Sequence, residues 1–433
     1  MNVTNYLTPA YLKEKLEHAG IQRYTKNLGW MFFARVMTMG ISFLATAYIA
    51  RNLGPTNYGE LSYAISFTSL FAFVASLGIE QVLYRELLAH PERRNVVMGT
   101  AVMLRMTVGA GAALLSVTLA TLISSDTLSP LLIAILSTSF FFSAFQLLGQ
   151  EFQADVRSKY PSLLSIVVTV ILNVLKIAVI VSGQGVIYLA GVLALEPILY
   201  AIGYVILRSK HYGSLRFFTF DSTLMRVILK DALPLTFVAA FSMIYARIDQ
   251  VFLKHMIDTA SVGLYDAAVR LSEVWYFIPN IVVAGLFPAL MNAKKDSSEL
   301  YAARARKLFL VVTIFTIGSA FLTTLFARPI VLIVFGSEFS AASSVLQIYI
   351  WSTIAIGMNL IAQYLLIAEK MGKYIAYSAG LGMIINIVLC ILLIPIWGMY
   401  GAAASSVVAY LVPFIALFCF KDTRLLMRTI FAF

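Results

Sequence analysis

Two oppositely charged residues, Arg247 and Asp249, lie in the middle of the apolar stretch SMIYARIDQVFLKHM. On a helix, two residues are separated by a rotation of about 200°, so these side chains point to opposite faces and cannot neutralise each other. A charge at the centre of a bilayer costs on the order of 2.5 to 3.5 kcal/mol. We therefore expect Arg247 to meet an anion, and Asp249 to meet a neighbouring helix or a coupling ion.

Other charged residues share this apolar setting. The cations are Arg35, Arg105 and Lys176, and the acidic residues are Glu273, Glu196 and, near the end of an apolar stretch, Glu80. Because cations exceed the clearly central anions, a negative ligand could complete the balance, and guanidinium groups match phosphate oxygens well. Snorkelling or structural pairing is the alternative for Arg35 and Arg105. A local ion pair at spacing i, i+3 is the alternative for Arg270 and Glu273.

The composition identifies the setting of these charges. The chain has 433 residues, of which 60% are hydrophobic and only 12% charged, and its mean hydropathy is +0.87. Soluble domains carry about 25% charged residues. The sequence therefore predicts an all-α integral membrane protein.

A bilayer core about 30 Å thick requires roughly 20 apolar residues per helix. Such stretches predict twelve transmembrane helices, near residues 28–50, 61–82, 96–122, 130–149, 162–182, 186–207, 232–253, 271–291, 308–327, 343–367, 374–394 and 398–420. This assignment places residues 254–270, including Arg270, in a loop.

The distribution of basic residues gives an independent test, since cytoplasmic loops accumulate Lys and Arg. With these helices, 24 basic residues fall on the side of both termini and four on the other side. Both termini are therefore expected in the cytoplasm. Topology accounts for the net charge of +11, so no nucleic-acid partner is expected.

Motifs for enzymatic chemistry are missing from the sequence. The two cysteines, Cys390 and Cys419, fall in apolar stretches and form no CxxC signature. There is no GxxxxGK[ST] loop, no HExxH and no pairing of a nucleophile with a base. We expect no catalytic residue, no metal site and no cofactor, and hence no enzyme.

An internal repeat organises the chain. YGELSYA at 58–64 resembles VGLYDAA at 262–268, SKY at 158–160 resembles GKY at 372–374, and Asn173 aligns with Asn386. The counterpart of Lys176, near Leu389, is apolar, which favours a cavity-facing role for this lysine. Two pseudo-symmetric six-helix lobes around a central cleft are therefore expected. The segments are a cytoplasmic N-terminal segment with an interfacial helix (1–27), an N-lobe (28–207), an inter-lobe loop (208–231), a C-lobe (232–420) and a cytoplasmic tail (421–433).

Longer stretches carry a resemblance to a known family. KNLGWMFFARVMTMG, YIARNLGPTNYGELSYAISF, IYARIDQVFLKHMIDTASVGLYDAAVRLSEVWYFIPN, FGSEFSAASSVLQI and LLIPIWGMYGAAASSVVAY resemble the polysaccharide-transporter branch of the MOP flippase superfamily, the Wzx-type O-antigen flippases. The resemblance implies translocation of undecaprenyl-pyrophosphate-linked oligosaccharide, as O-antigen or exopolysaccharide repeat units, across the bacterial inner membrane by alternating access. It also implies two V-shaped lobes with a cationic cavity.

The resemblance extends to particular residues. Related lipid II flippases carry arginines in and just after the first helix and an arginine with a following glutamate in the eighth, matched here by Arg35, Arg51, Arg270 and Glu273. The candidate cationic cleft comprises Arg35, Arg51, Arg105, Lys176, Arg247 and Arg270. Asp249 or Glu273 could carry a coupling H⁺ or Na⁺. The expected partners are the lipid-linked oligosaccharide, the bilayer, and polysaccharide polymerase and chain-length proteins.

Two alternatives stay open from the sequence. A small-molecule or drug cation antiporter of the same superfamily would use acidic residues in its lobes, whereas basic residues dominate here. A scaffold for polysaccharide assembly enzymes would tolerate neutralised cavity charges and depend on its loops instead.

Overall fold

The computed structural model describes residues 19–431, which form helices joined by short turns and contain no strand. Most of the expected N-terminal interfacial helix and the last two residues of the expected tail lie outside these residues. The described part of the N-terminal segment, from Ala19, begins the first long helix.

The chain divides into two compact units. Unit 1 contains Met1–Thr46, Val74–Leu119 and Ala134–Leu233, and unit 2 contains Ala47–Phe73, Ala120–Ile133 and Pro234–Phe433. Two segments from the first half of the sequence thus belong with the second half. This division differs from the expected lobe boundaries, which remain a prediction.

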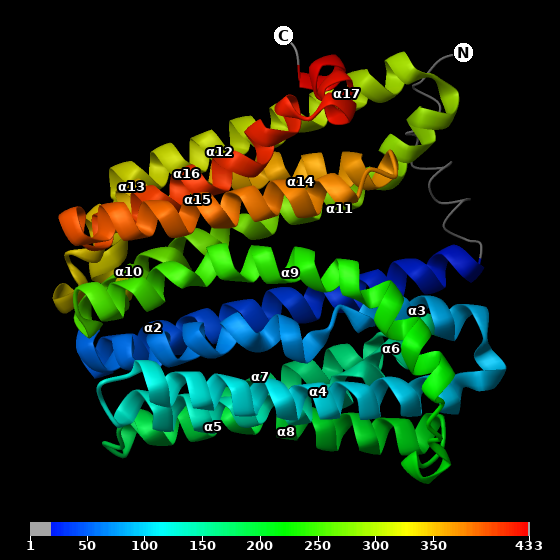
Figure 1. Ribbon diagram of the computed structural model, residues 1–433, viewed down its shortest axis with the longest axis horizontal. Coiled ribbons are helices and arrows are strands. Elements are labelled where there is room, and N and C mark those ends of the chain that lie inside the picture. Colours follow the sequence, from blue (N-terminus) through cyan, green and yellow to red (C-terminus); the bar gives the residue numbers. More distant parts are fainter. Residues whose placement is uncertain (1–18, 432–433) are drawn as a thin grey trace. The chain divides into compact units, whose positions relative to one another are not determined.

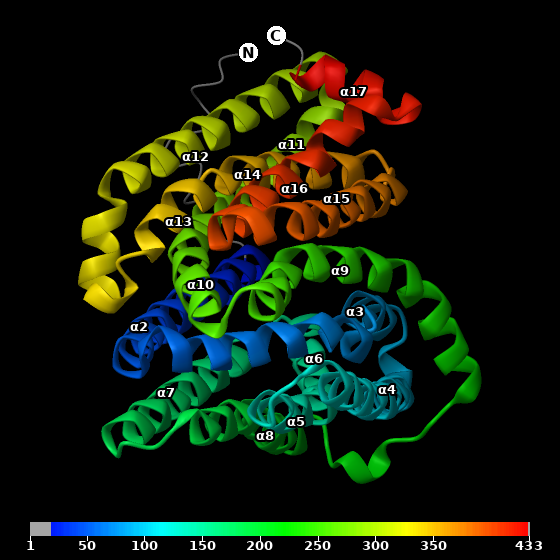
Figure 2. The same cartoon turned by 60° about the vertical axis from the view of Figure 1, so that its left-hand side comes forward.

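Unit 1 wholly contains α3 (Ile79–Ala89), α6 (Leu148–Ala154), α7 (Lys159–Val181) and α8 (Val186–His211), with the 3-10 turns Pro91–Arg93, Ser143–Leu147 and Leu215–Phe217. In Figures 1 and 2, α7 and α8 lie alongside each other. Residues of both units occur in α2 (Ala19–Ser76), α4 (Arg94–Ile123), α5 (Leu128–Phe142) and α9 (Ser222–Met256). The largest core cluster described in unit 1 joins α3, the start of α4, residues 144–148 and the first turns of α9.

Unit 2 wholly contains α10 (Thr259–Glu273), α11 (Phe277–Asp296), α12 (Ser298–Val334), α13 (Ala342–Tyr349), α14 (Ser352–Ala368), α15 (Lys373–Trp397), α16 (Met399–Cys419) and α17 (Lys421–Phe431). The 3-10 turns of this unit are Val274–Tyr276 and Ser337–Phe339. An apolar cluster from α11, α12, α14, α15, α16 and α17 forms its core. The close pairing of α15 with α16 is visible in Figure 1.

Eleven helical stretches among the described residues are long and apolar enough to cross a membrane. The first, Gly29–Ala89, contains 61 residues and would be about 90 Å long if straight, three times a bilayer core. Gly54 interrupts it with φ 71° and ψ 169°, a conformation that favours glycine, and Pro55 begins the next turns. The expected twelve helices separate this stretch into two at that point, and their number stays a prediction.

The expected loop at residues 254–270 is wrong. Most of it is helix α10, which begins after Asp258, whose side chain accepts a hydrogen bond of 2.7 Å from the backbone N–H of Ser261. This cap satisfies one of the unpaired N–H groups at a helix start. Polar residues such as Asp266 and Arg270 lowered the hydropathy of the segment, which is why the sequence placed the membrane span too late.

Candidate functional site

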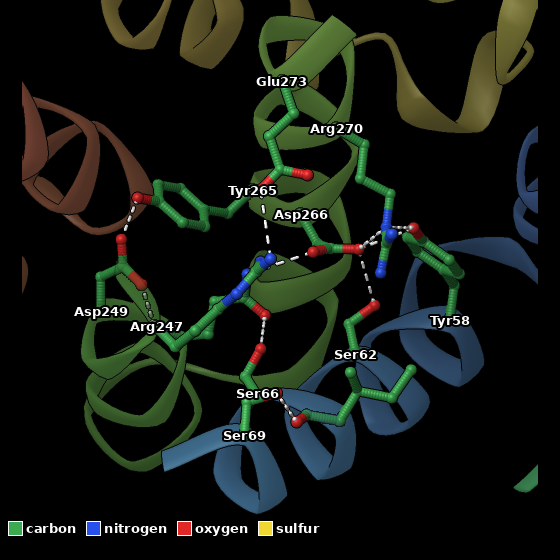
Figure 3. Close-up of polar contacts among 12 residues, drawn as sticks. Tyr58, Ser62, Ser66, Ser69, Arg247, Asp249, Tyr265, Asp266, Arg270 and Glu273 are labelled. Carbon is green, nitrogen blue, oxygen red and sulfur yellow. Dashed lines mark hydrogen bonds and ion pairs between the residues drawn. The ribbon is translucent and has the colours of Figure 1, made fainter. Parts of the chain in front are cut away.

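Asp266 on α10 is the centre of a buried polar network in unit 2 (Figure 3). Its residue is only 1% exposed, and Oδ2 accepts hydrogen bonds from the Tyr58 hydroxyl at 2.7 Å and the Ser62 hydroxyl at 3.0 Å. Oδ1 accepts from the Gln250 side-chain amide at 3.1 Å. The carboxylate therefore joins α2, α9 and α10.

Arg270 completes this network one turn further along α10. Its Nε donates to Asp266 Oδ2 at 2.7 Å and to the Tyr58 hydroxyl at 2.9 Å. The ion pair with Asp266 replaces the local pair with Glu273 that the i, i+3 spacing suggested. Arg270 thus has a buried anionic partner on its own helix.

Close approach of two helix backbones brings these groups together. A Cβ atom on Gly59 of α2 would lie 2.0 Å from the Thr259 carbonyl oxygen, and one on Gly263 of α10 would lie 2.1 Å from the Pro55 carbonyl oxygen. Only glycine fits at either position. Gly59 and Gly263 are also the aligned glycines of the internal repeat, and Ser62 and Asp266 are likewise aligned, so equivalent positions touch.

Arg247 and Asp249 on α9 take separate partners, as their opposite faces require. Arg247 Nη2 donates to Glu273 Oε1 at 3.1 Å. Asp249 accepts hydrogen bonds from the hydroxyls of Tyr265 and Ser406, the latter at 2.9 Å. Asp249 is 2% exposed, and no basic side chain forms an ion pair with it in the described part of the chain.

A second polar cluster surrounds Lys254 near the end of α9. Its Nζ lies 2.7 Å from Glu60 Oε2 and 3.3 Å from Asp126 Oδ2, and it also bonds to the Ser129 hydroxyl. Asp126 lies between the candidate spans. Burial raises the pKa of Asp126, but hydrogen bonds from the backbone and hydroxyl of Ser129, together with Lys254, outweigh it and leave the pKa below its usual value.

Unit 1 contains two of the expected cationic residues in compensated positions. Arg105 Nη1 donates to Glu80 Oε1 at 3.0 Å, and the arginine is 5% exposed. Lys176 is half-buried and acts electrostatically on the carboxylate of Glu196. Both residues therefore have acidic neighbours inside the same unit.

Arg208, expected in the inter-lobe loop, is instead completely buried in α8. Its Nε donates to Glu151 at 3.0 Å, Nη1 to the Gly213 carbonyl at 2.6 Å and Nη2 to Asn95 at 2.6 Å. The guanidinium also lies over the Phe218 ring, 4.3 Å from its centroid. This arginine is an internal brace of unit 1.

Arg35 and Arg51 differ from the other candidates. Both are exposed, and neither forms an ion pair with any residue between 19 and 431. Arg51 packs beside Gly336 in unit 2, where a Cβ on the glycine would lie 3.3 Å from the arginine Nε. The uncompensated positive charge of the candidate set therefore resides on these two residues.

The charge balance of the apolar stretches is closer than the sequence suggested, because Asp266 had been assigned to a loop. Each remaining candidate cation has an acidic neighbour: Arg105 with Glu80, Lys176 with Glu196, Arg247 with Glu273, and Arg270 with Asp266. Tyr58, Ser62, Gln250 and Asp266 were missed as site residues. The alignment of Ser62 with Asp266 in the repeat was the one signal available for them.

A metal or cofactor site is not indicated by these groups. Among the described residues, no three His, Cys, Asp or Glu side chains are grouped so that they could hold a metal ion. The arrangement is suited to electrostatic binding rather than to covalent chemistry.

Solved structures define the class of this protein. An inward-facing MATE multidrug resistance transporter of the MOP superfamily superposes with a TM-score of 0.78 at 13% identity, covering 90% of this chain and 95% of that one. The lipid II flippase MurJ, in an inward closed conformation, gives 0.73 at 16% identity, covering 91% and 87%. The protein is a multi-pass integral membrane protein with the fold of MOP superfamily transporters.

Sequence comparison identifies the family. A model of the family described as "Polysaccharide biosynthesis protein" matches residues 24–294, so the chain belongs to that family. A Haloferax volcanii protein, "Probable low-salt glycan biosynthesis flippase Agl15", is 21% identical over 391 residues, covering 88% of this chain and 80% of that protein. The resemblance identified from the sequence is confirmed, and the family and fold are those of transporters and not of an enzyme.

Proposed function

We propose that this protein is a flippase for undecaprenyl-pyrophosphate-linked oligosaccharide, the repeat unit of an O-antigen or exopolysaccharide, in the bacterial inner membrane. Membership of the polysaccharide biosynthesis family and the likeness to a protein described as a glycan flippase support this function. Twelve helices in two pseudo-symmetric lobes around a cleft, with both termini cytoplasmic, would provide alternating access.

The observation that carries the proposal is the uncompensated charge of Arg35 and Arg51. Exposed guanidinium groups without an acidic partner are suited to bind pyrophosphate oxygens through paired hydrogen bonds. Arg105, Lys176, Arg247 and Arg270 already have acidic neighbours, so they contribute to the path through the rest of the cationic set. The sugar would cross in a wet cleft while the polyprenyl chain stays in lipid.

Asp249 and Glu273 are our candidates for coupling to H⁺ or Na⁺. Asp249 is bonded by hydroxyl groups and has no basic partner, so its charge state can depend on a small cation. Polysaccharide polymerase and chain-length proteins are the proposed protein partners, since they would receive the translocated unit.

Transbilayer movement of polyprenyl-pyrophosphate-linked oligosaccharide in proteoliposomes tests the function. We expect the wild type to move the lipid and the double variant Arg35→Ala/Arg51→Ala to lose most of this movement, because the pyrophosphate loses its uncompensated partners. The matched control is Arg328→Ala, since Arg328 is also exposed and has no ion pair among residues 19–431. Undiminished movement by the folded double variant would contradict the role of the arginines.

A drug cation antiporter is the second candidate function. The MATE transporter fold and the base-free carboxylate of Asp249 favour it. In the same proteoliposomes, expulsion of a cationic dye along a H⁺ or Na⁺ gradient, lost in Asp249→Asn and unaccompanied by lipid movement, would support this function over the flippase.

A further inference from the structure

The Arg270 guanidinium is held along one edge and open along the other. Nε donates both to Asp266 and to Tyr58, while Nη1 and Nη2 make no hydrogen bond within residues 19–431. The arginine side chain is 28% exposed, whereas that of Asp266 is 1% exposed. The terminal nitrogens are therefore the part of this buried network that is left for a ligand.

Asp266 has no capacity left for a ligand of its own. Its carboxylate accepts from Tyr58, Ser62, Gln250 and Arg270, which uses the roughly four acceptor sites that a carboxylate offers. Three of these donors come from α2, α9 and α10 at the crossing of the aligned glycines. The carboxylate is consequently fixed in position by three helices.

We propose that Asp266 is a positioning residue that aims the Nη1/Nη2 edge of Arg270 at an oxyanion of the substrate. Two parallel N–H groups on that edge match two oxygens of a phosphate or a carboxylate. A guanidinium already fixed through Nε loses less rotational freedom when it binds, so the same contacts give a higher affinity. The inference rests on the proposed transport of an anionic lipid-linked substrate and assigns Arg270 a preorganised role in it.

Two sources could supply this oxyanion, the pyrophosphate of the carrier lipid or an acidic sugar. The pyrophosphate is common to all such substrates, whereas a sugar carboxylate is present only in some. Transport should therefore be measured with one polyprenyl pyrophosphate carrying either a neutral oligosaccharide or the same oligosaccharide with one uronic acid. A defect of equal size with both identifies the pyrophosphate, and a defect confined to the uronic acid substrate identifies the sugar.

The variants are Asp266→Asn, which keeps the shape and removes the charge, and Tyr58→Phe, which keeps the ring packed 5.9 Å from that of Phe339. We expect the half-saturating substrate concentration to rise about tenfold in Asp266→Asn and about threefold in Tyr58→Phe, with smaller changes in the maximal rate. Ser69→Ala is the control, because Ser69 bonds only to the Ile65 carbonyl of its own helix, at 2.7 Å. It should retain the wild-type concentration dependence.

A merely structural role gives a different pattern. Loss of folded protein lowers the maximal rate in proportion and leaves the half-saturating concentration unchanged, and that result in both variants would overturn the inference. Tyr58→Phe keeps the test valid if Asp266→Asn does not fold. Absence of movement by the wild type would instead refute the proposed function, so the two failures are distinguishable.

Discussion

Two arginine–carboxylate pairs, Arg208–Glu151 in unit 1 and Arg270–Asp266 in unit 2, have similar distances and different surroundings. Arg208 and Glu151 are both completely buried, and each guanidinium nitrogen of Arg208 has a partner. Arg270 uses only Nε, and its side chain is partly exposed. The comparison teaches that the bonding of the terminal nitrogens, rather than the presence of an acidic partner, separates a structural arginine from one available to a ligand.

The closed pair should give the largest effect on stability. Glu151→Leu leaves the Arg208 charge buried without its partner, and breaking a buried pair costs about 3–5 kcal/mol. We expect a strong loss of thermal stability in detergent, measured by the unfolding midpoint of the purified protein. The double variant Glu151→Leu/Arg208→Met should recover part of it, and an unchanged midpoint for Glu151→Leu would remove the distinction between the pairs.

The open pair should affect transport more than stability. Arg270→Ala removes the group that we expect to bind an oxyanion, and charged hydrogen bonds contribute about 1.5–3 kcal/mol, so transport at low substrate should fall at least about tenfold. Arg270→Lys should restore only part, because lysine lacks the paired N–H edge. Equal transport by Arg270→Lys and the wild type would show that charge alone is sufficient. The initial rate of lipid-linked oligosaccharide movement is the measurement.

The open pair also depends on the crossing of α2 with α10. Gly263→Ala places a methyl group 2.1 Å from the Pro55 carbonyl oxygen, and overpacking costs about 1–3 kcal/mol. We expect a lower unfolding midpoint. Gly318→Ala is the matched control, since Gly318 is an exposed helical position with nothing within 4 Å of the added carbon. Equal midpoints in the two variants would exclude the close approach.

A pH-dependent contribution should be the smallest effect and belongs to unit 1 near the closed pair. Burial raises the pKa of Asp155, but the Arg94 and Tyr212 hydrogen bonds outweigh it and leave the pKa lowered. A lowered pKa contributes stability above the unfolded value, about 3.9, and this is lost as pH falls through the folded value. The unfolding midpoints of wild type and Asp155→Asn should therefore differ at pH 7 and converge below about pH 4. A constant difference would contradict this assignment.

Much of the fold was predictable because its dominant signal is the length of apolar stretches. Residues 374–394, for example, lie wholly within helix α15, and 398–420 differs from α16 by one residue at each end. The failures occurred where helices carry polar residues that pair with one another. Asp266 and Arg270 made α10 look like a loop, and Arg208 was counted as a loop cation although Glu151 buries it.

The candidate site was predictable only in part. The opposite orientations of Arg247 and Asp249 followed from helix geometry, and the structure gives them separate partners. Glu273 was a candidate, but its pairing with Arg247 depends on how α9 meets α10, which no local pattern contains. Asp266 could be recognised only after the contact between repeat-aligned positions was known.

The crossing of Gly59 with Gly263 has a consequence for how this sequence can change over evolution. At an ordinary contact between side chains, an enlargement on one helix can be accommodated by a smaller residue on the other. Here each glycine would gain a Cβ within about 2 Å of the opposite main chain, and neither position has any atom to lose. No second-site substitution at the facing glycine can rescue the first, so the two positions must stay glycine together while the residues around them diverge.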